Sequence, residues 1–297
     1  MAFPIHELAA LGTATCWAAT ALFSSGPASW LGAPAFNRLR QIAVTLMLAL
    51  VVGISGSWRE LSGEMMLPLI LSGLLGITLG DTVNFATVVR LGPRRAGVLF
   101  ALNAPMAACL GWVFLGETLQ MQTVIGILTC FCGTVLAIRF GGRGTHQLDA
   151  IKGSLATGIG FGLLAALGQA TGSILARPVM ASGLDAFAAS LVRVGFAGAA
   201  LSVLMRLPIP SLVQRNPLNT RVFWQTIGIA FLGLMVGMTL MLYALQGGKV
   251  GIITTLTATS PVIILPMLWL RMGQRPAPGA WAGAALVVVG MALIFTR

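Results

Sequence analysis

The chain has 297 residues, of which 57% are hydrophobic and only 8% are charged, whereas about a quarter of the residues are charged in an ordinary soluble domain. This composition excludes a soluble enzyme or binding module and indicates an integral membrane protein. The net charge is +11, but no basic run alternates with aromatic residues as it does on a nucleic-acid-binding surface. We therefore expect a lipid bilayer around the chain and no nucleic-acid partner.

Ten apolar runs are long enough to cross a membrane, which requires about 20 residues for each helix. They are expected at about 7–26, 34–53, 65–89, 95–114, 121–139, 152–174, 184–205, 223–244, 250–270 and 279–296. The first run should end at Gly26-Pro27, because proline interrupts a helix. The connections between the runs are too short to hold a folded domain. The predicted fold class is an all-α integral membrane protein with ten transmembrane helices, placed as a multi-pass protein in the plasma (inner) membrane.

The residues that usually carry catalysis or bind metals form no recognisable motif. Cys16, Cys109, Cys130 and Cys132 lie within the predicted spans and lack C-x-x-C spacing. The two histidines lie outside the spans, and neither H-E-x-x-H nor G-x-S-x-G occurs. We expect no catalytic residue, no metal, no cofactor and no enzyme activity.

The second half of the chain repeats the first at an offset of 157 residues. Seven identities share this offset: Gly76 with Gly233, Gly80 with Gly237, Thr82 with Thr239, Trp112 with Trp269, Gly116 with Gly273, Gly126 with Gly283 and Gly133 with Gly290. Each half holds five spans, an odd number, so the second half must enter the membrane from the opposite side. We therefore predict two inverted five-helix repeats, residues 1–145 and 146–297. Inverted repeats are typical of transporters that expose one site to alternate faces of the membrane.

The fourth and fifth spans carry a pattern with a known counterpart. Pro105 and Trp112 precede Leu115-Gly116-Glu117, and a helix with Gly126 and Gly133 follows. With Trp17 in the first span and Arg40 and Arg193 in the second and seventh, this pattern resembles the EamA-type ten-helix members of the drug/metabolite transporter superfamily. In the second copy Pro261 follows the pattern, but Gln274 stands where the first copy has Glu117.

The resemblance implies a secondary transporter of small metabolites, often amino acids or related amphipathic solutes and frequently exported. It also implies a central cavity lined by helices 1–4 and 6–9, with helices 5 and 10 outside. We expect a monomer or a homodimer formed through these peripheral helices. Because the second repeat lacks a carboxylate at its Gln274 turn, we interpret Glu117, like Pro105 and Pro261, as structural.

Asp81 is the only carboxylate deep within a predicted span. An ionised aspartate at the bilayer centre costs about 2.5–3.5 kcal/mol on insertion scales, so it should face a cavity or a partner. We predict a proton-coupling role or a ligand for a substrate amine, and the alternative is a structural ion pair with Arg40, Arg90 or a neighbouring helix end. Asn84 lies three residues on, and therefore on the same helix face.

The remaining candidates for substrate binding are polar or aromatic residues inside the spans. They are Trp17, Asn84, Asn103, Gln169, Arg193 and Tyr243. Arg193 is favoured for attracting a substrate carboxylate, because Arg40 lies near enough to a span end to extend its guanidinium to the interface. For all of these residues helix packing is the alternative.

The distribution of Lys and Arg predicts on which side of the membrane the termini lie. Lys and Arg number about four on the side of the termini and up to 13 on the other side, which by the positive-inside rule places both termini outside the cytoplasm. The predicted function is export by alternating access with proton exchange. Two alternatives are uptake or exchange of an anionic or nucleotide-like metabolite anchored by Arg193, and a membrane scaffold subunit without transport.

Overall fold

The computed structural model describes residues 5–115, 120–140, 151–247, 256–257, 259–273 and 275–295. Within these ranges the chain is helical and contains no β-strand. The predicted boundary between the repeats, at residue 145, and the turn residue Glu117 lie outside the described residues.

The helices follow one another in the same order in both halves. The first half contains α1 (Ile5–Leu31), α2 (Ala33–Ser55), the short η1 (Ser57–Glu60), α3 (Gly63–Gly73), η2 (Leu74–Asp81), α4 (Thr82–Ala101), α5 (Asn103–Leu115) and α6 (Met121–Phe140). The second half contains α7 (Leu155–Ala181), α8 (Ala186–Leu204), α9 (Thr220–Ala230), η3 (Phe231–Met238), α10 (Thr239–Gly247), α12 (Ser260–Met272) and α13 (Pro278–Phe295).

Among the described residues, seven helical stretches are long and apolar enough to cross a membrane. One of them, Gly63–Phe114, covers the third and fourth predicted spans. It changes direction at Gly92, whose φ of 82° lies in the left-handed region that glycine adopts without steric cost. Pro93 then begins the next helical segment. Two shorter apolar helices, Ser260–Arg271 and Pro278–Ile294, lie in the ninth and tenth predicted spans. Within the described residues every predicted span thus contains an apolar helix, and the all-α fold class is confirmed.

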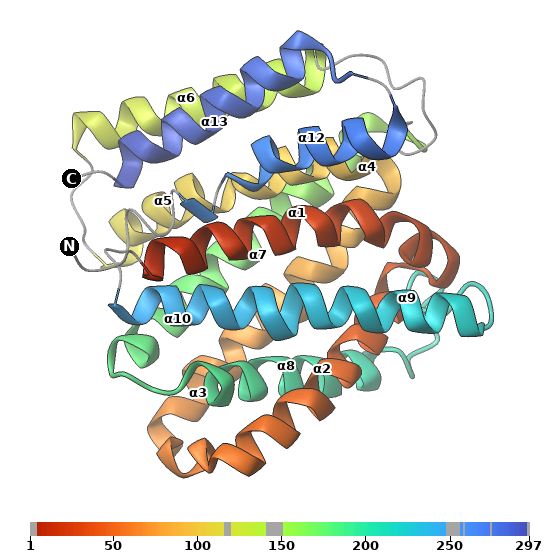
Figure 1. Ribbon diagram of the computed structural model, residues 1–297, viewed down its shortest axis with the longest axis vertical. Helices are drawn as coiled ribbons and strands as arrows, with labels where there is room; N and C mark the ends of the chain where they lie inside the picture. Colours follow the sequence, from red (N-terminus) through yellow and green to blue (C-terminus); the bar gives the residue numbers. More distant parts are fainter. Residues whose placement is uncertain are drawn as a thin grey trace.

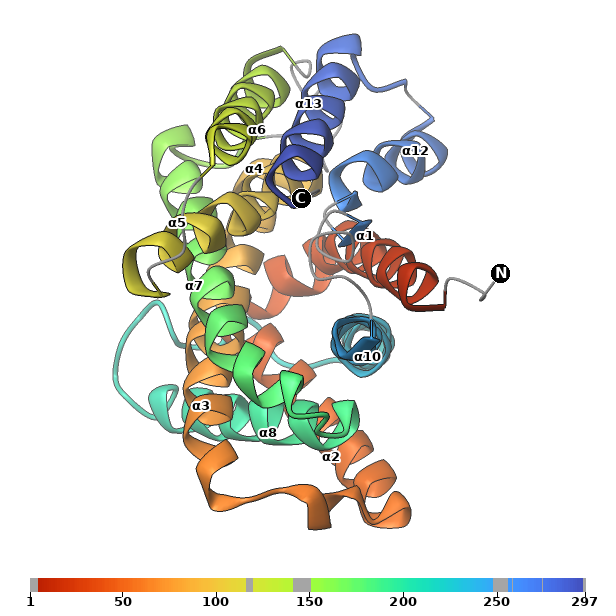
Figure 2. The same ribbon diagram turned by 90° about the vertical axis from the view of Figure 1, so that its left-hand side faces the viewer.

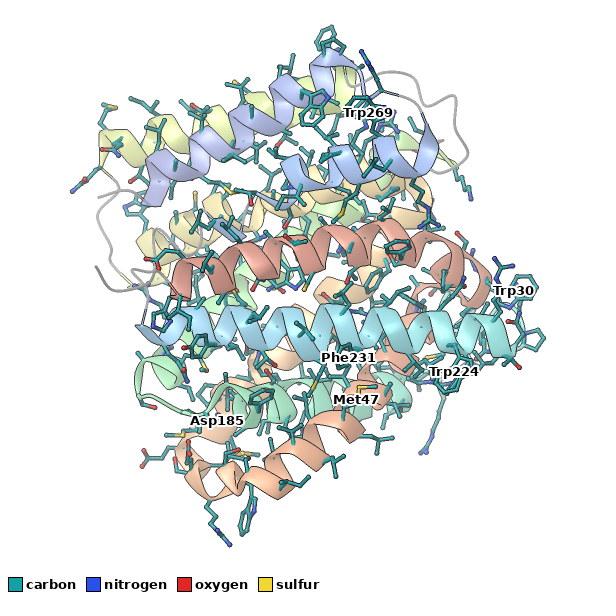
Figure 3. The ribbon with its side chains drawn as sticks, viewed as in Figure 1. Trp30, Met47, Asp185, Trp224, Phe231 and Trp269 are labelled. Atoms are coloured by element: carbon teal, nitrogen blue, oxygen red, sulfur yellow. The ribbon has the colours of Figure 1, made fainter. Side chains whose placement is uncertain are left out.

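The predicted end of the first span is wrong, because α1 continues through Pro27 to Leu31. The last turn is held from outside the helix. The Leu31 carbonyl accepts a hydrogen bond from the Arg215 backbone N–H at 3.0 Å, and the Trp30 ring N–H donates to the Pro217 carbonyl at 3.0 Å. These contacts anchor the end of the helix beyond Pro27 to the segment around Arg215. Figure 3 shows Trp30 and Trp224 together at this end of the bundle, opposite Asp185.

The packing of α6 against α13 shows that the repeats are inverted. A Cβ atom added to Gly126 would lie 2.6 Å from the Gly290 carbonyl oxygen, and one added to Gly133 would lie 2.8 Å from that of Gly283. Contacts therefore advance along α6 while they recede along α13, so these repeat-equivalent helices run antiparallel. Figures 1 and 2 place this pair at one edge of the molecule, away from α2 and α3.

At the centre, each repeat packs its third span against the first span of the other repeat. The segments η2 and η3 are both π-helical, with wider turns than an α-helix, and they begin and end at positions 157 residues apart. Gly76 and Gly80 of η2 lie on α7, and Gly233 and Gly237 of η3 lie on α1. Such close approach of helices is typical of the Gly-x-x-x-Gly spacing that both segments share. The centre of the molecule is thus built by both repeats.

Candidate functional site

A cavity of about 80 Å³ lies at this junction of the repeats. Its wall comes from α1, α2, η2 and α4 of the first repeat and from α7, η3 and α12 of the second. The polar residues at the wall are Thr20, Arg40, Asp81, Asn84, Gln169 and Ser260. The larger apolar residues are Trp17, Phe85, Phe100, Leu234, Met238 and Ile264. A wall of this mixed character suits a small solute that has both polar and apolar parts.

Arg40 and Asp81 form an ion pair at this cavity. The Arg40 Nη1 atom lies 3.5 Å from the Asp81 Oδ2 atom, with 2% of the Arg40 side chain and 15% of the Asp81 side chain exposed. The guanidinium carbon also lies 4.4 Å from the centre of the Phe85 ring and 5.7 Å from that of Phe36. The expectation that Arg40 extends to the membrane interface is wrong, because the carboxylate and the two aromatic rings hold it inside the bundle.

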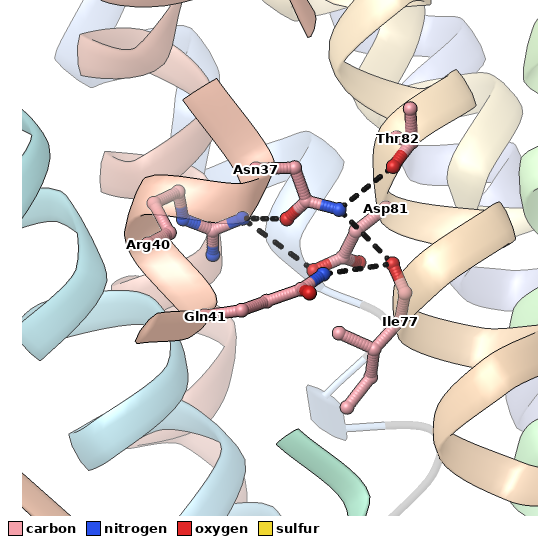
Figure 4. Close-up of polar contacts among 6 residues, drawn as sticks. All are labelled: Asn37, Arg40, Gln41, Ile77, Asp81 and Thr82. Carbon is pink, nitrogen blue, oxygen red and sulfur yellow. Dashed lines mark hydrogen bonds and ion pairs between the residues drawn. The ribbon is translucent and has the colours of Figure 1, made fainter. Parts of the chain in front are cut away.

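Side chains of α2 fix the backbone that carries Asp81 (Figure 4). The Asn37 amide donates to the Ile77 carbonyl at 3.1 Å and to the Thr82 hydroxyl at 2.9 Å, and Gln41 donates to the same carbonyl at 3.5 Å. Asn37 Oδ1 in turn accepts from Arg40 Nη1 at 3.2 Å. These bonds pin α2 to η2 and set both members of the ion pair in place.

Four of the predicted site residues line the cavity: Trp17, Asp81, Asn84 and Gln169. The Trp17 ring meets the Phe100 ring edge to face, with 6.4 Å between centroids. The Asn84 Oδ1 atom is buried and accepts no hydrogen bond from any described residue. A buried carbonyl oxygen without a donor is costly, so this atom is available to a solute that donates a hydrogen bond.

Three predicted substrate-binding residues lie outside the cavity wall in this structure. The Asn103 amide donates to the Phe100 carbonyl at 2.6 Å, a contact within its own turn. Tyr243 is 37% exposed, with its ring 5.1 Å from that of His6. Arg193 is 3% exposed and lies behind Met238, with 3.4 Å between its Nη1 atom and the Met238 Sδ atom.

Two of the residues interpreted as structural lie at the starts of short helices. Pro105 is buried in the first turn of α5, just after the chain leaves α4 at Leu102. Pro261 is buried in the first turn of α12. Proline suits a first helical turn, where its missing N–H would have no helical acceptor.

The sequence prediction omitted several residues that shape the site. They are Asn37, Gln41, Thr20, Phe85, Met238 and Ser260. Asn37 and Gln41 had a usable signal, because they are amide side chains one helical turn apart beside an arginine in an apolar run. Met238 had another, because the repeat offset applied to Asp81 leads to it. The others carry no signal that separates them from ordinary helix-packing residues.

Comparisons with known proteins agree with this architecture. The model of the EamA-like transporter family matches residues 5–139 and 156–296. A curated relative from Sinorhizobium sp., described as an uncharacterized transporter in the cobO 3′ region, is 28% identical over 135 residues, which cover 44% of this chain and 94% of the relative. A solved crystal structure aligns with a TM-score of 0.64 at 18% identity, covering 98% of this chain and 99% of the other. At that identity the likeness shows the fold alone.

Proposed function

The chain belongs to the EamA-like transporter family, and from this premise we propose that it is a secondary active transporter that exports small amphipathic metabolites across the plasma (inner) membrane. Membership of this family and the likeness to a curated transporter make it a multi-pass membrane transporter. The substrate class, the direction and the coupling to protons are the proposal, as is the absence of enzyme activity. We further propose that it acts as a monomer or as a homodimer joined through α6 and α13.

The observation that carries the proposal is the position of Asp81. This carboxylate is 15% exposed at a cavity whose wall both repeats supply. A group on a cavity wall that both repeats supply can be presented to either membrane face when the halves exchange their arrangements.

Proton exchange follows from the two states open to this carboxylate. Ionised, Asp81 pairs with Arg40 and can accept hydrogen bonds from a solute. Protonated, it no longer balances the Arg40 charge and holds the solute less well. Binding of a proton from one side therefore favours release of the solute on that side, which couples proton entry to solute export. Asn84, Gln169 and Trp17 contribute polar and aromatic contacts at the same wall.

The test uses purified protein in liposomes and a panel of radiolabelled amphipathic metabolites. In the variant Asp81→Asn we expect pH-gradient-driven transport to be lost, while counterflow exchange without a gradient is retained. The matched control is Asp185→Asn. Asp185 caps the start of α8 by accepting from the Ala188 N–H at 2.9 Å, asparagine caps a helix equally well, and the residue does not line the cavity.

Asp81 is not the coupling group if the variant still follows the pH gradient. Direction is tested separately, by comparing efflux from preloaded cells with uptake by depleted cells. Faster uptake would favour the exchange of an anionic metabolite, and the absence of any transport by folded protein would favour a scaffold subunit.

A further inference from the structure

Each repeat has an equivalent buried arginine, and the two arginines contact different side chains. In the first repeat, Arg40 of α2 contacts Asp81, the last residue of η2, at 3.5 Å. In the second repeat, Arg193 of α8 contacts Met238, the last residue of η3, at 3.4 Å. Asp81 and Met238 are separated by the repeat offset of 157 residues. A thioether therefore stands where the first repeat has a carboxylate.

The two arginines occupy equivalent places, as their surroundings show. A Cβ atom added to Gly76 would lie 3.7 Å from Arg193 Nη2, and one added to Gly233 would lie 3.3 Å from Arg40 Nη2. Gly76 and Gly233 are themselves repeat equivalents. Each guanidinium thus lies against the equivalent glycine of the opposite repeat. The two sites therefore have the same position in their repeats and differ in the side chain that faces the arginine.

Arg193 has less compensation for its charge than Arg40. Among the described residues no carboxylate lies within salt-bridge distance of it, and its Nε atom donates no hydrogen bond. Its direct polar contact is a thioether sulfur, which is a weak acceptor. It interacts with Asp81 only at longer range, and that carboxylate already pairs with Arg40.

Arg40, Arg193 and Asp81 together therefore carry a formal charge of +1. A buried cation without a partner is costly, and one added anion would balance it. The planar guanidinium group binds a carboxylate through two parallel hydrogen bonds. Met238 lines the cavity in front of Arg193, and its unbranched side chain has three rotatable bonds, so it can move aside.

We propose that Arg193 binds a carboxylate of the transported solute, and that Met238 determines this specificity by leaving the guanidinium without a protein carboxylate. The inference rests on the proposed transport function and assigns the substrate class. The solute has an acidic group that reaches Arg193 past Met238, while its other polar groups face Asp81 and Asn84 across the cavity.

Acetate is a suitable probe because it is small enough for the cavity, and acetamide is its neutral match. The melting temperature of the detergent-purified full chain would be measured in sodium acetate, in sodium chloride at the same ionic strength, and with acetamide. The wild type and Met238→Leu should be stabilised by acetate beyond chloride or acetamide. In Met238→Asp the new carboxylate pairs with Arg193, so we expect the apparent affinity for acetate to fall by about tenfold or more.

The proposal is wrong if acetate stabilises the wild type no better than chloride does, or if Met238→Asp keeps the full acetate response. The comparison of the wild-type melting temperature in acetate and in chloride tests the proposal even if Met238→Asp fails to fold. The swap Asp81→Met with Met238→Asp gives a further check, because it moves the ion pair to Arg193 and leaves Arg40 facing a thioether. The acetate response that Met238→Asp loses should therefore return in the swap, now through Arg40. This assay needs no proton gradient, so it can fail while Asp81-dependent transport succeeds, and the reverse.

Discussion

The polar centres of the two repeats are alike in backbone and unlike in chemistry. In the first repeat, amides and a carboxylate surround Arg40 and bond it to η2. At the positions 153 residues further on, Ser190 replaces Asn37 and Val194 replaces Gln41, while Arg193 corresponds to Arg40. The Ser190 hydroxyl is buried and has no hydrogen-bond partner among the described residues. The first repeat thus has a locked ion pair, and the second has an arginine held mainly by packing.

This difference separates two requirements of a transporter. Alternating access needs a symmetric backbone, which the antiparallel α6–α13 pair and the matched π-helical segments supply. Recognition of a solute needs an asymmetric set of charges, which the replacement of Asp81 by Met238 supplies. The duplicated fold could keep its symmetric backbone while mutation of single residues produced the asymmetric set of charges.

The strongest test of the comparison replaces each arginine by methionine. Arg40→Met leaves the buried Asp81 without its partner, so we expect the free energy of unfolding to fall by about 3–5 kcal/mol. Arg193→Met removes a cation that has no paired carboxylate, so the loss should be below about 1 kcal/mol. Unfolding of the two variants in mixed detergent micelles measures both values. Equal losses would show that the two centres are equivalent after all.

A smaller effect is expected at the glycines under the arginines. A Cβ atom at Gly233 would lie 2.6 Å from Thr20 Oγ1, whereas one at Gly76 finds nothing closer than 3.4 Å. We expect Gly233→Ala to lower the free energy of unfolding by about 1–3 kcal/mol through overpacking, and Gly76→Ala to be tolerated. The same unfolding assay measures both variants. If Gly76→Ala lowers the free energy of unfolding as much as Gly233→Ala does, the close packing of η3 against Thr20 is not the cause.

The smallest effect concerns the side chains beside the arginines. Asn37→Leu removes three hydrogen bonds at one residue, each worth about 0.6 kcal/mol inside a membrane protein, so a loss of about 2 kcal/mol is the upper value. Ser190→Ala removes a hydroxyl without a partner and should leave stability unchanged or slightly raised. A clear loss in Ser190→Ala would reveal a bond from this hydroxyl in solution and weaken the contrast between the repeats.

Much of the architecture could be predicted from the sequence, because the membrane constrains the length and hydrophobicity of each helix, and both can be read along the chain. Hydrophobic length sets the number of spans, and an odd number of spans per repeat sets the inversion. The resemblance to the EamA-type transporters implied that the fifth and tenth helices lie outside, and α6 and α13 do lie together at one edge of the molecule. The end of α1 was missed because its last turn is held by a distant segment around Arg215.

The candidate site was predicted only in part, and the reason is physical. The sequence identified Asp81 as exceptional, since a lone acid in an apolar helix needs a partner or a cavity wherever it lies. Which partner it has depends on helices brought together by folding. The pairing with Arg40, the position of Arg193 behind Met238, and the removal of Asn103 and Tyr243 from the cavity wall were all decided by tertiary packing. Sequence spacing fixes which residues share a face of one helix, but it does not fix which faces meet.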